Sequence, residues 1–287
     1  MGGLPPGELR GIQCPSVRSE GARAFAMTYC IGIKVNDGLV FAADTRTSAG
    51  VDDVRTYNKL HSFVFPGERV FVLMSAGNLA TTQAVITAIK RDLQAEAAHS
   101  LRTPPTVYEV AEYIGALSQR AQKQVAAGET KATTGIETTF ILGGQVHGEE
   151  PQLYLIYPLG NCISVSPETP FLQIGEHKYG KPILDRIIRP PTSLEDAARC
   201  ALVSLDSTMR SNLSVGPPLD LAIVPADGFD ISHRMRLDLD TPFYQALKES
   251  WARKLEAVFA ELPRFDWEAG NEKGSGHPDE GNVLRLR

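Results

Sequence analysis

The regular alternation of apolar and polar positions along this chain starts at Thr28. Two strand-like runs, Thr28–Val35 and Leu39–Thr45, flank a turn formed by Asn36, Asp37 and Gly38. Asn, Asp and Gly accept the backbone angles of a tight hairpin more readily than other residues do. The pattern therefore predicts an antiparallel β-hairpin as the first element of the fold.

Two helical segments follow a third strand. The buried strand Val70–Ser75 runs into a break at Gly77-Asn78, and a helical segment then extends from Leu79 to about Ala97. A second helix is indicated by apolar residues three or four positions apart, which share one helix face. These residues are Val110, Ile114, Leu117, Ala121 and Val125. The two helices are expected to pack side by side.

The second half of the chain returns to strands. Four short strands separated by Gly and Pro turns are expected to build a second antiparallel sheet. They are Thr138–Gly143, Gln152–Tyr157, Cys162–Val165 and Leu172–Ile174. Thr192 and Glu195 then form a capping-box pattern ahead of a helix, and a strand at Leu219–Val224 follows.

The closing helix starts at Pro242 and carries one apolar stripe. The stripe consists of Phe243, Leu247, Trp251, Leu255 and Val258. We interpret Phe243 and Trp251 as core residues. An interface between subunits is the alternative for the exposed half of this helix.

The order of these elements predicts the fold class and the domain limits. Strands, two helices, more strands and more helices fit an α+β fold with two packed antiparallel sheets and helix pairs outside, a four-layer αββα sandwich. We expect one domain over residues 28–265. Residues 1–27, rich in Gly, Pro, Arg and Ser, lack periodicity and are interpreted as an extension, and residues 266–287 as a flexible tail.

Composition excludes several classes of function. The 287 residues carry a net charge of −5 and no long run of like charges, which argues against nucleic acid and anionic membranes as partners. No stretch has the roughly 18 consecutive apolar residues of a membrane span, and the first 26 residues lack the apolar core of a secretory signal. The four cysteines, Cys14, Cys30, Cys162 and Cys200, are far apart and are interpreted as reduced thiols. A cytoplasmic location is therefore expected.

The hairpin brings an acid to the start of the first strand. With the turn centred on Asn36–Gly38, Thr28 lies opposite a residue between Thr45 and Thr47, within reach of Asp44. In isolation, Asp44 has an ordinary explanation as a strand end followed by a turn. In isolation, Lys59 is likewise explained as a solvated surface lysine, and Gly77 as a turn between a strand and a helix.

The spacing of these residues resembles the start of mature proteasome β-subunits. The resemblance is carried by four stretches: Tyr29–Lys34, Asp37–Val40, Ala42–Arg46 and Ser48–Gly50. The last two form an A-A-D-x-R-x-x-A-G-like motif, and in this family its Asp stands sixteen residues after an N-terminal Thr, as Asp44 does after Thr28. Lys59 comes fifteen residues after Asp44, one fewer than the family spacing. The opening Met27-Thr28-Tyr29-Cys30 is similar to that of the bacterial proteasome-related Anbu group.

The resemblance implies an N-terminal-nucleophile hydrolase with a defined set of site residues. Thr28 would be the nucleophile, Asp44 and Lys59 its charged partners, and the backbone N–H of Gly77 the oxyanion donor, while Arg46 and Gly50 match the motif. Two positions depart from the family pattern. Glu176 follows Gly175 where many β-subunits have Ser, and Ser211 precedes Ser214 where they have Asp. The accessory cluster around the amine of the nucleophile is therefore altered.

The chemistry explains why such a threonine must be N-terminal. A hydroxyl is a weak nucleophile and needs a nearby base, and a free α-amine with a pKa of roughly 7.7–8.0 can accept its proton. Lys59, as a cation, would ease deprotonation of Thr28, and Asp44 would hold Lys59 charged and oriented. A fixed N–H at Gly77 would stabilise the tetrahedral oxyanion.

Cofactors and metals are not expected. Residues Gly175–Lys181 fit G-x-x-x-x-G-K, but Pro182 stands where a phosphate-binding loop has Ser or Thr, and Glu176 would repel phosphate. The six histidines are scattered without the spacing of a metal site.

Three functions remain open from the sequence. The first is a threonine peptidase that cleaves peptide or amide bonds through an acyl-Thr28 intermediate inside a ring or helical homo-oligomer. The second is a small-molecule amidase of the same class, and the third is an inactive oligomeric scaffold. The resemblance also leaves open an ATPase partner or proteins of an amide-ligase-linked pathway. Residues 1–26 are either a propeptide or the product of a misplaced start, with Met27 as the true first residue.

Overall fold

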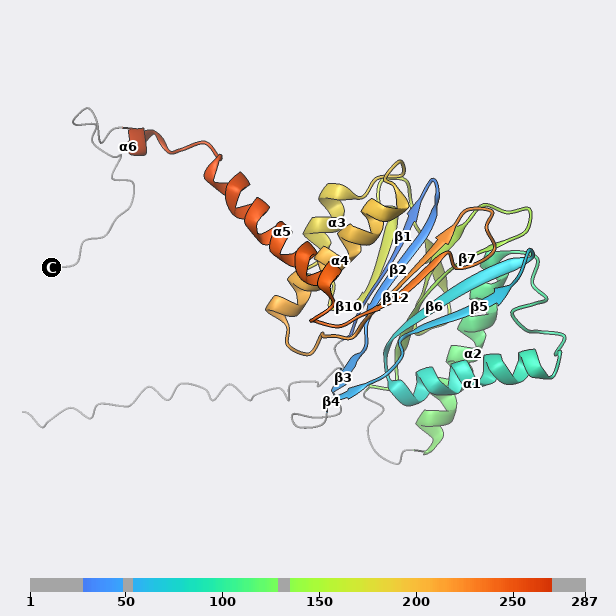
Figure 1. Ribbon diagram of the computed structural model, residues 1–287. Coiled ribbons are helices and arrows are strands. Elements are labelled where there is room, and N and C mark those ends of the chain that lie inside the picture. The colour runs from blue at the N-terminus through green and yellow to red at the C-terminus, as the bar shows by residue number, and fades with distance from the viewer. Residues whose placement is uncertain (1–27, 49–53, 129–134, 270–287) are drawn as a thin grey trace, which may run out of the picture.

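The protein is described by a computed structural model over residues 28–48, 54–128 and 135–269 (Figure 1). The expected extension at residues 1–27 lies outside the described residues. So do Gly50 of the motif, Cys14, and residues 270–287 of the expected tail.

The first hairpin forms as predicted. Strands β1 (Tyr29–Val35) and β2 (Gly38–Asp44) pair antiparallel, with Val35 opposite Gly38 and Cys30 opposite Ala43. Only Asn36 and Asp37 remain in the turn. Gly38 has φ of +140°, and a Cβ there would lie 2.2 Å from the carbonyl oxygen of Val224, so this turn requires glycine.

Two five-stranded antiparallel sheets form the centre of the molecule (Figure 1). The first sheet has the order β10-β1-β2-β11-β12, and the second has the order β5-β6-β7-β8-β9. The further strands of the first sheet are β10 (Phe171–Gly175), β11 (Leu219–Pro225) and β12 (His233–Leu237). The second sheet comprises β5 (Leu60–Phe65), β6 (Arg69–Gly77), β7 (Thr138–Val146), β8 (Gln152–Ile156) and β9 (Cys162–Ser164). A separate two-stranded ladder joins β3 (Arg46–Ser48) to β4 (Val54–Thr56).

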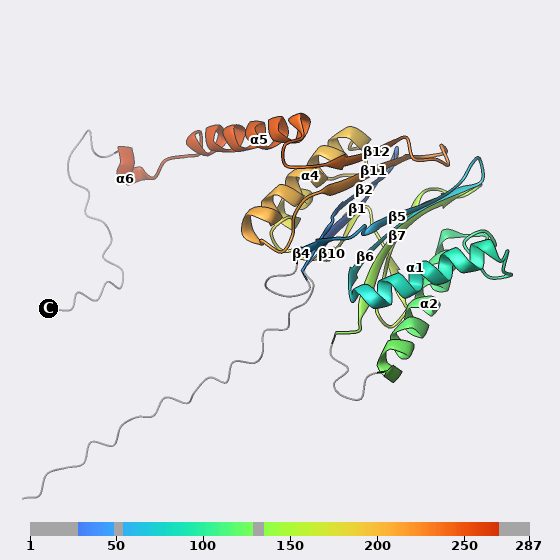
Figure 2. The same cartoon turned by 60° about the horizontal axis from the view of Figure 1, so that its bottom comes forward.

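Helices cover the outer faces of both sheets (Figure 1). Helices α1 (Leu79–Gln94) and α2 (Val107–Gly128) pack on the second sheet, and α3 (Lys181–Ile187) and α4 (Leu194–Ser211) pack on the first. Helix α5 (Pro242–Ala260) contacts α4 near its start and then extends away from the body, with the short α6 (Asp266–Ala269) beyond it (Figure 2). The four-layer αββα sandwich is thus confirmed.

Alternation along the strands explains why there are three core layers. On β2, Leu39, Phe41 and Ala43 point into the layer between the two sheets, while Val40 and Ala42 point to the opposite face, into the layer under α3 and α4. A third cluster fills the space between the second sheet and the helices α1 and α2. Because successive strand residues face opposite sides, a strand buried on both faces is apolar along most of its length, as β2 is from Leu39 to Ala43 before it ends at Asp44.

The assignment of the short strands to one new sheet is wrong in part. β7, β8 and β9 do belong together, but they join β5 and β6, and β10 pairs instead with β1, with Tyr29 opposite Gly175. Apolar alternation identifies a strand but carries no information about which sheet edge it joins. The sequence interpretation also contained no β3, β4, β5, α3 or β12.

Two predicted helix details also differ. The N-cap of α4 is Ser193, whose hydroxyl accepts a hydrogen bond from the N–H of Asp196 at 3.1 Å. The hydroxyl of Thr192 instead accepts from the N–H of Arg189. On α5, Tyr244 is the residue that is fully buried, and Phe243 is 47% exposed, so the interpretation of Phe243 as core is wrong.

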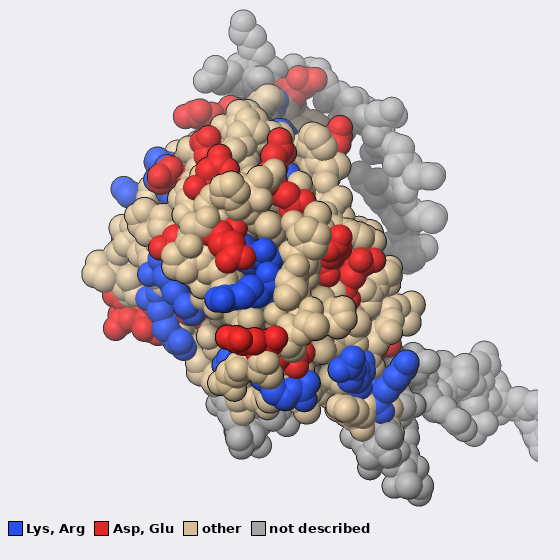
Figure 3. Space-filling model, turned by 90° about the vertical axis from the view of Figure 1, so that its right-hand side faces the viewer, with Lys and Arg blue, Asp and Glu red and all other residues tan. Residues whose placement is uncertain are grey.

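The surface carries mixed charges. On the face shown in Figure 3, acidic and basic side chains are interspersed, without a broad basic area. Within the described ranges, no helix combines the length and the apolar character that crossing a bilayer would take.

Candidate active site

Thr28 lies immediately before β1 and is 4% exposed. Its carbonyl oxygen accepts a hydrogen bond of 2.7 Å from the N–H of Glu176, just beyond β10. Gly175 has φ of +84°, and a Cβ at this position would lie 1.7 Å from the same oxygen. Only glycine allows β10 to approach so closely, and this approach fixes the backbone of Thr28.

The hairpin register places Asp44 beside the start of β1. Continuing the pairing of Cys30 with Ala43 puts Thr28 opposite Thr45, within the predicted interval. The N–H of Tyr29 donates to Asp44 Oδ1 at 2.9 Å. Thr45 is anchored in turn, because both its N–H and its hydroxyl donate to the carbonyl of Pro218.

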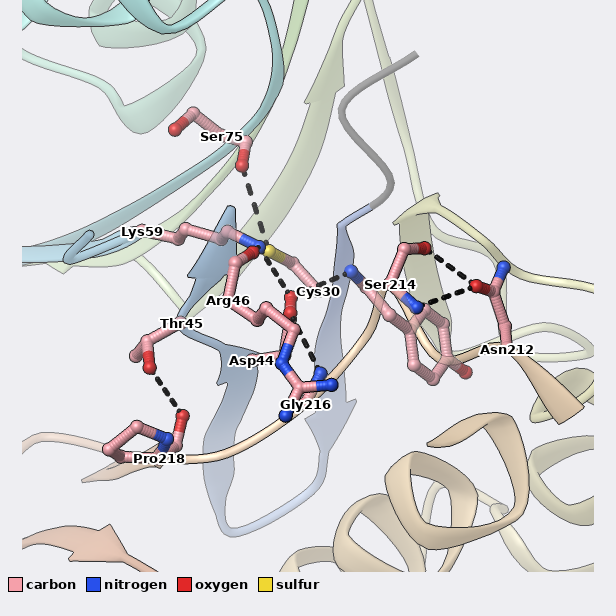
Figure 4. A network of polar contacts seen from close by, with 11 residues as sticks. Cys30, Asp44, Thr45, Arg46, Lys59, Ser75, Asn212, Ser214, Gly216 and Pro218 are labelled. Atoms are coloured by element: carbon pink, nitrogen blue, oxygen red, sulfur yellow. Dashed lines mark hydrogen bonds and ion pairs between the residues drawn. The ribbon is translucent and has the colours of Figure 1, made fainter. Parts of the chain in front are cut away.

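Asp44 is the centre of a buried polar network (Figure 4). Lys59 Nζ donates to Asp44 Oδ1 at 2.7 Å and to the carbonyl of Arg46 at 2.5 Å. The N–H of Gly216 reaches Asp44 Oδ2 at 3.3 Å from the opposite side. Asp44 is 0% and Lys59 5% exposed, so neither charge is compensated by bulk water.

Burial is the largest influence on the pKa values of Asp44 and Cys30 in this network. It raises the pKa of the Asp44 carboxyl above its ordinary value, and the Lys59 ammonium and the N–H groups of Tyr29 and Gly216 lower it in part. Burial also raises the pKa of the Cys30 thiol, whose Sγ lies 3.7 Å from the carbonyl of Ser75. Cys30 is therefore a neutral packing residue beside the ion pair and not a thiolate.

Arg46 organises the loop that follows α4. Its guanidinium donates to the carbonyl of Leu213 at 2.7 Å. A Cβ on Gly216 would lie 2.4 Å from the guanidinium carbon, so Gly216 leaves the space that the arginine occupies. Arg46 thus holds the loop whose N–H reaches Asp44.

Gly77 ends β6 with φ of +118°. A Cβ there would lie 2.3 Å from the carbonyl of Glu137, so the position requires glycine. Next to it, Asn78 caps α1 by accepting from the N–H of Thr81. Gly77 also borders a cavity of about 430 Å³ that Glu176 lines from the other sheet.

The accessory cluster contains a residue that the sequence did not single out. Asn212 Nδ2 donates to Glu176 Oε2 at 3.2 Å, and Ser214 donates from its hydroxyl to Asn212 Oδ1 at 2.6 Å. Ser211, the last residue of α4, is exposed, and its side chain hydrogen-bonds to no other described residue. Asn212 directly follows the helix, and no local sequence pattern marks it as a site residue.

The other features considered in the sequence lie outside this network. The stretch Gly175–Lys181 leads into α3, and Lys181 Nζ pairs with Asp185 on that helix. Within the described ranges, no group of three or more His, Cys, Asp or Glu side chains is arranged to hold a metal ion. Cys30, Cys162 and Cys200 are free thiols.

The fold and the buried Asp44–Lys59 pair beside the first strand together define the class of protein. Two antiparallel sheets enclosed by helix pairs form the fold of the N-terminal-nucleophile hydrolases, and here the candidate nucleophile directly precedes the first strand. Comparison with known proteins agrees: the family model "Proteasome subunit" matches residues 27–224.

Three relatives make the family more specific. An Anbu (Gly-1) mutant from Hyphomicrobium sp. strain MC1 is 46% identical, with a TM-score of 0.77 over 83% of this chain and 99% of that one. Anbu from Pseudomonas aeruginosa, solved as a helical assembly, is 43% identical, with a TM-score of 0.77 over 83% and 98%. Proteasome subunit beta 2 of Pyrobaculum aerophilum is 27% identical over 69% of this chain and 89% of its own length. The chain belongs to the proteasome subunit family, in its Anbu group.

Proposed function

We propose that this chain is a threonine peptidase that hydrolyses peptide or amide bonds through an acyl-Thr28 intermediate. The observation that carries the proposal is the buried ion pair between Asp44 and Lys59, which lies where the N–H of Tyr29 binds the same carboxylate. A buried charged pair is costly to desolvate, and its place beside the first residue of β1 suits a chemical role better than a stabilising one.

The proposed reaction requires that Thr28 carry a free α-amine. The amine takes the proton from the Thr28 hydroxyl, whose oxygen attacks the carbonyl carbon of the substrate. The resulting oxyanion receives a hydrogen bond from the N–H of Gly77, a contribution of about 2.7–4 kcal/mol in comparable sites. The C–N bond then breaks as the leaving amine takes up the proton, and water hydrolyses the ester. Throughout, Lys59 stays a cation held by Asp44 and lowers the cost of negative charge on the hydroxyl oxygen.

We also propose that the chain acts as a homo-oligomer. The Pseudomonas aeruginosa relative is described as a helical assembly. The C-terminal half of α5 extends from the body and exposes Leu255, Val258 and Phe259, which are 54%, 58% and 74% exposed. A row of exposed apolar side chains on a projecting helix favours contact with another copy.

An activity probe tests the peptidase proposal. A peptide epoxyketone or β-lactone should label the purified chain once, at Thr28, and intact mass should show a chain that begins at Thr28. A Thr28→Ala variant should remain unlabelled. A wild-type chain that retains residues ahead of Thr28 and fails to react would favour the inactive scaffold.

Substrate panels separate peptidase from small-molecule amidase. Fluorogenic peptides and glutamyl amides should be compared with the same preparation, and we expect turnover of the peptides. Turnover confined to the small amides would favour the amidase.

N-terminal sequencing of the Thr28→Ala variant distinguishes the two origins of the terminus. A self-cleaved propeptide would remain attached in this variant. Removal of Met27 by an aminopeptidase would leave the variant starting at residue 28.

A further inference from the structure

A cavity opens between the two sheets at the end where Thr28 lies. Its volume is about 430 Å³. Gly77 at the end of β6 and Glu137 just before β7 lie on one wall. Gly175 at the end of β10 and Glu176 just after it lie on the other. The N–H of Glu176 binds the carbonyl of Thr28, so the cavity adjoins the candidate nucleophile.

The floor of this cavity is apolar. Ala76, Leu155 and Ile174 contribute to it, and the same residues belong to or pack against the hydrophobic layer between the sheets. Pro158 adds further apolar surface. An unbranched aliphatic segment inserted here would replace water at these side chains, which is favourable.

The rim of the cavity is acidic. Glu137, which is exposed, and Glu176, which is half-buried, both line it from facing sheets. Among its described lining residues there is no lysine or arginine, and Tyr157 and His177 are the other titratable groups. Asn212 and the N–H of Lys178 bind the Glu176 carboxylate, which fixes its position without adding a positive charge.

We infer that this cavity is a substrate subsite for a lysine or arginine side chain next to the scissile bond. The inference rests on the proposed peptidase function and adds the substrate class. The methylene stem packs on the apolar floor, and the cationic head lies between Glu137 and Glu176. Long cationic side chains bind in this way because stem and head prefer different surroundings.

Matched peptides test the inference by hydrolysis. Internally quenched peptides of neutral sequence should carry lysine, norleucine or glutamate at each position flanking the scissile bond. Lysine and norleucine share the stem and differ in charge, so the ratio of their kcat/KM values isolates the head group. At one flanking position we expect lysine to exceed norleucine by roughly fivefold, and the ratio to fall with added salt.

Substitutions at the rim of the cavity test which residue causes the preference for lysine over norleucine. Glu137→Gln should bring the ratio of lysine to norleucine toward one, and Glu137→Lys should make glutamate the better substrate. Glu150→Gln is the matched control, because Glu150 is exposed and lines a different cavity together with Val35 and Asn36 at the hairpin turn. A wild-type ratio near one, or an equal fall for Glu137→Gln and Glu150→Gln, would overturn the inference.

A binding measurement separates this inference from the peptidase proposal. Fluorescent forms of the lysine and norleucine peptides should be titrated with the full Thr28→Ala chain, and anisotropy recorded. The lysine peptide should bind roughly fivefold more tightly, and the difference should vanish with Glu137→Gln. Equal affinities would refute the subsite whether or not the wild-type chain hydrolyses peptides. A preference in binding without hydrolysis would refute the peptidase proposal alone.

Discussion

Lys59 Nζ lies 2.7 Å from Asp44 Oδ1, and both side chains are shielded almost completely from water. The two residues come from different sheets: Asp44 ends β2, and Lys59 directly precedes β5. The ion pair therefore bridges the two sheets at the end where Thr28 lies. Its formation depends on the packing of both sheets, and its loss should affect both stability and reactivity.

Removing the Lys59 cation alone should destabilise the protein more than removing both charges of the ion pair. Lys59→Met leaves Asp44 buried and unpaired, which should lower the free energy of unfolding by about 3–5 kcal/mol. The double variant Asp44→Asn/Lys59→Met should recover part of this loss, because the N–H groups of Tyr29 and Gly216 keep an acceptor. Chemical denaturation of the single and double variants gives the coupling energy, expected to exceed about 1 kcal/mol.

The rate of reaction at Thr28 should not follow stability in these single and double variants. Neither Lys59→Met nor the double variant retains the cation, so both should react with a Thr28-directed probe at least about 100-fold more slowly than wild type. A double variant that regains stability and also reacts at the wild-type rate would show that the ion pair is purely structural.

Gly77→Ala should disrupt the candidate oxyanion site. The new methyl group would lie 2.3 Å from the carbonyl of Glu137 at a positive φ angle, so β6 and β7 must separate at this point. We expect a loss of about 2–4 kcal/mol in unfolding free energy and slow probe labelling. Gly67→Ala is the control, since Gly67 has φ of +72° with no atom within 4 Å of its added Cβ. Equal effects of the two variants on labelling would contradict a special role for Gly77.

Asn212 should act as a positioning residue through Glu176. Asn212→Ala removes the donor to the Glu176 carboxylate and the acceptor of the Ser214 hydroxyl, and we expect labelling about tenfold slower. Asn212→Asp should be slower still, because it places a second carboxylate beside Glu176. Both variants should shift the pH profile of labelling, which a merely structural role would leave unchanged. Ser211→Ala is the comparison, because the Ser211 side chain is exposed, and its effect should be smaller.

The sequence predicted the parts of this site that depend on local geometry. The two-residue turn at Asn36 and Asp37 sets the register of the hairpin, and the register alone places Asp44 beside the first residues of β1. No local feature of the sequence predicts that Lys59 lies near Asp44, and its prediction as a site residue rested on the residue spacing of the proteasome family. The structure brings it to Asp44 through contact between the two sheets.

Other parts of the site could not be predicted from one sequence. Asn212 and Gly216 reach Glu176 and Asp44 through a loop whose course depends on α4 and on the guanidinium of Arg46. Periodicity likewise shows that one face of α5 is apolar but not what covers that face. The roles of Thr28 and its partners in catalysis remain predictions.

Stability should depend on pH through His61 of β5. Burial, followed by the positive charges of Lys90 and Arg234, lowers the pKa of His61 to about 4 from its ordinary value of 6.5. Between these values the unfolded chain binds the proton and the folded chain does not. The contribution of His61 to stability is therefore complete above about pH 6.5 and is lost as pH falls toward about 4.

Comparison with a variant isolates this effect. Chemical denaturation of wild type and His61→Gln at about pH 7.5 and about pH 5 should show a larger loss of unfolding free energy for wild type. Parallel pH dependence of the two proteins would mean that His61 keeps its ordinary pKa in the folded chain.

The apolar face of α5 should hold the oligomer together. Leu255 and Val258 lie three residues apart on the part of the helix that leaves the body, and both are more than half exposed. Leu255→Glu/Val258→Glu places two charges on this face, and burial of unpaired charges against another copy is prohibitive. Light scattering should therefore show an assembly for wild type and a monomer for the double variant, with the same circular dichroism. Arg253→Glu changes the opposite side of α5 and should leave the assembly intact. A double variant that remains assembled would place the subunit contact on another surface of the molecule.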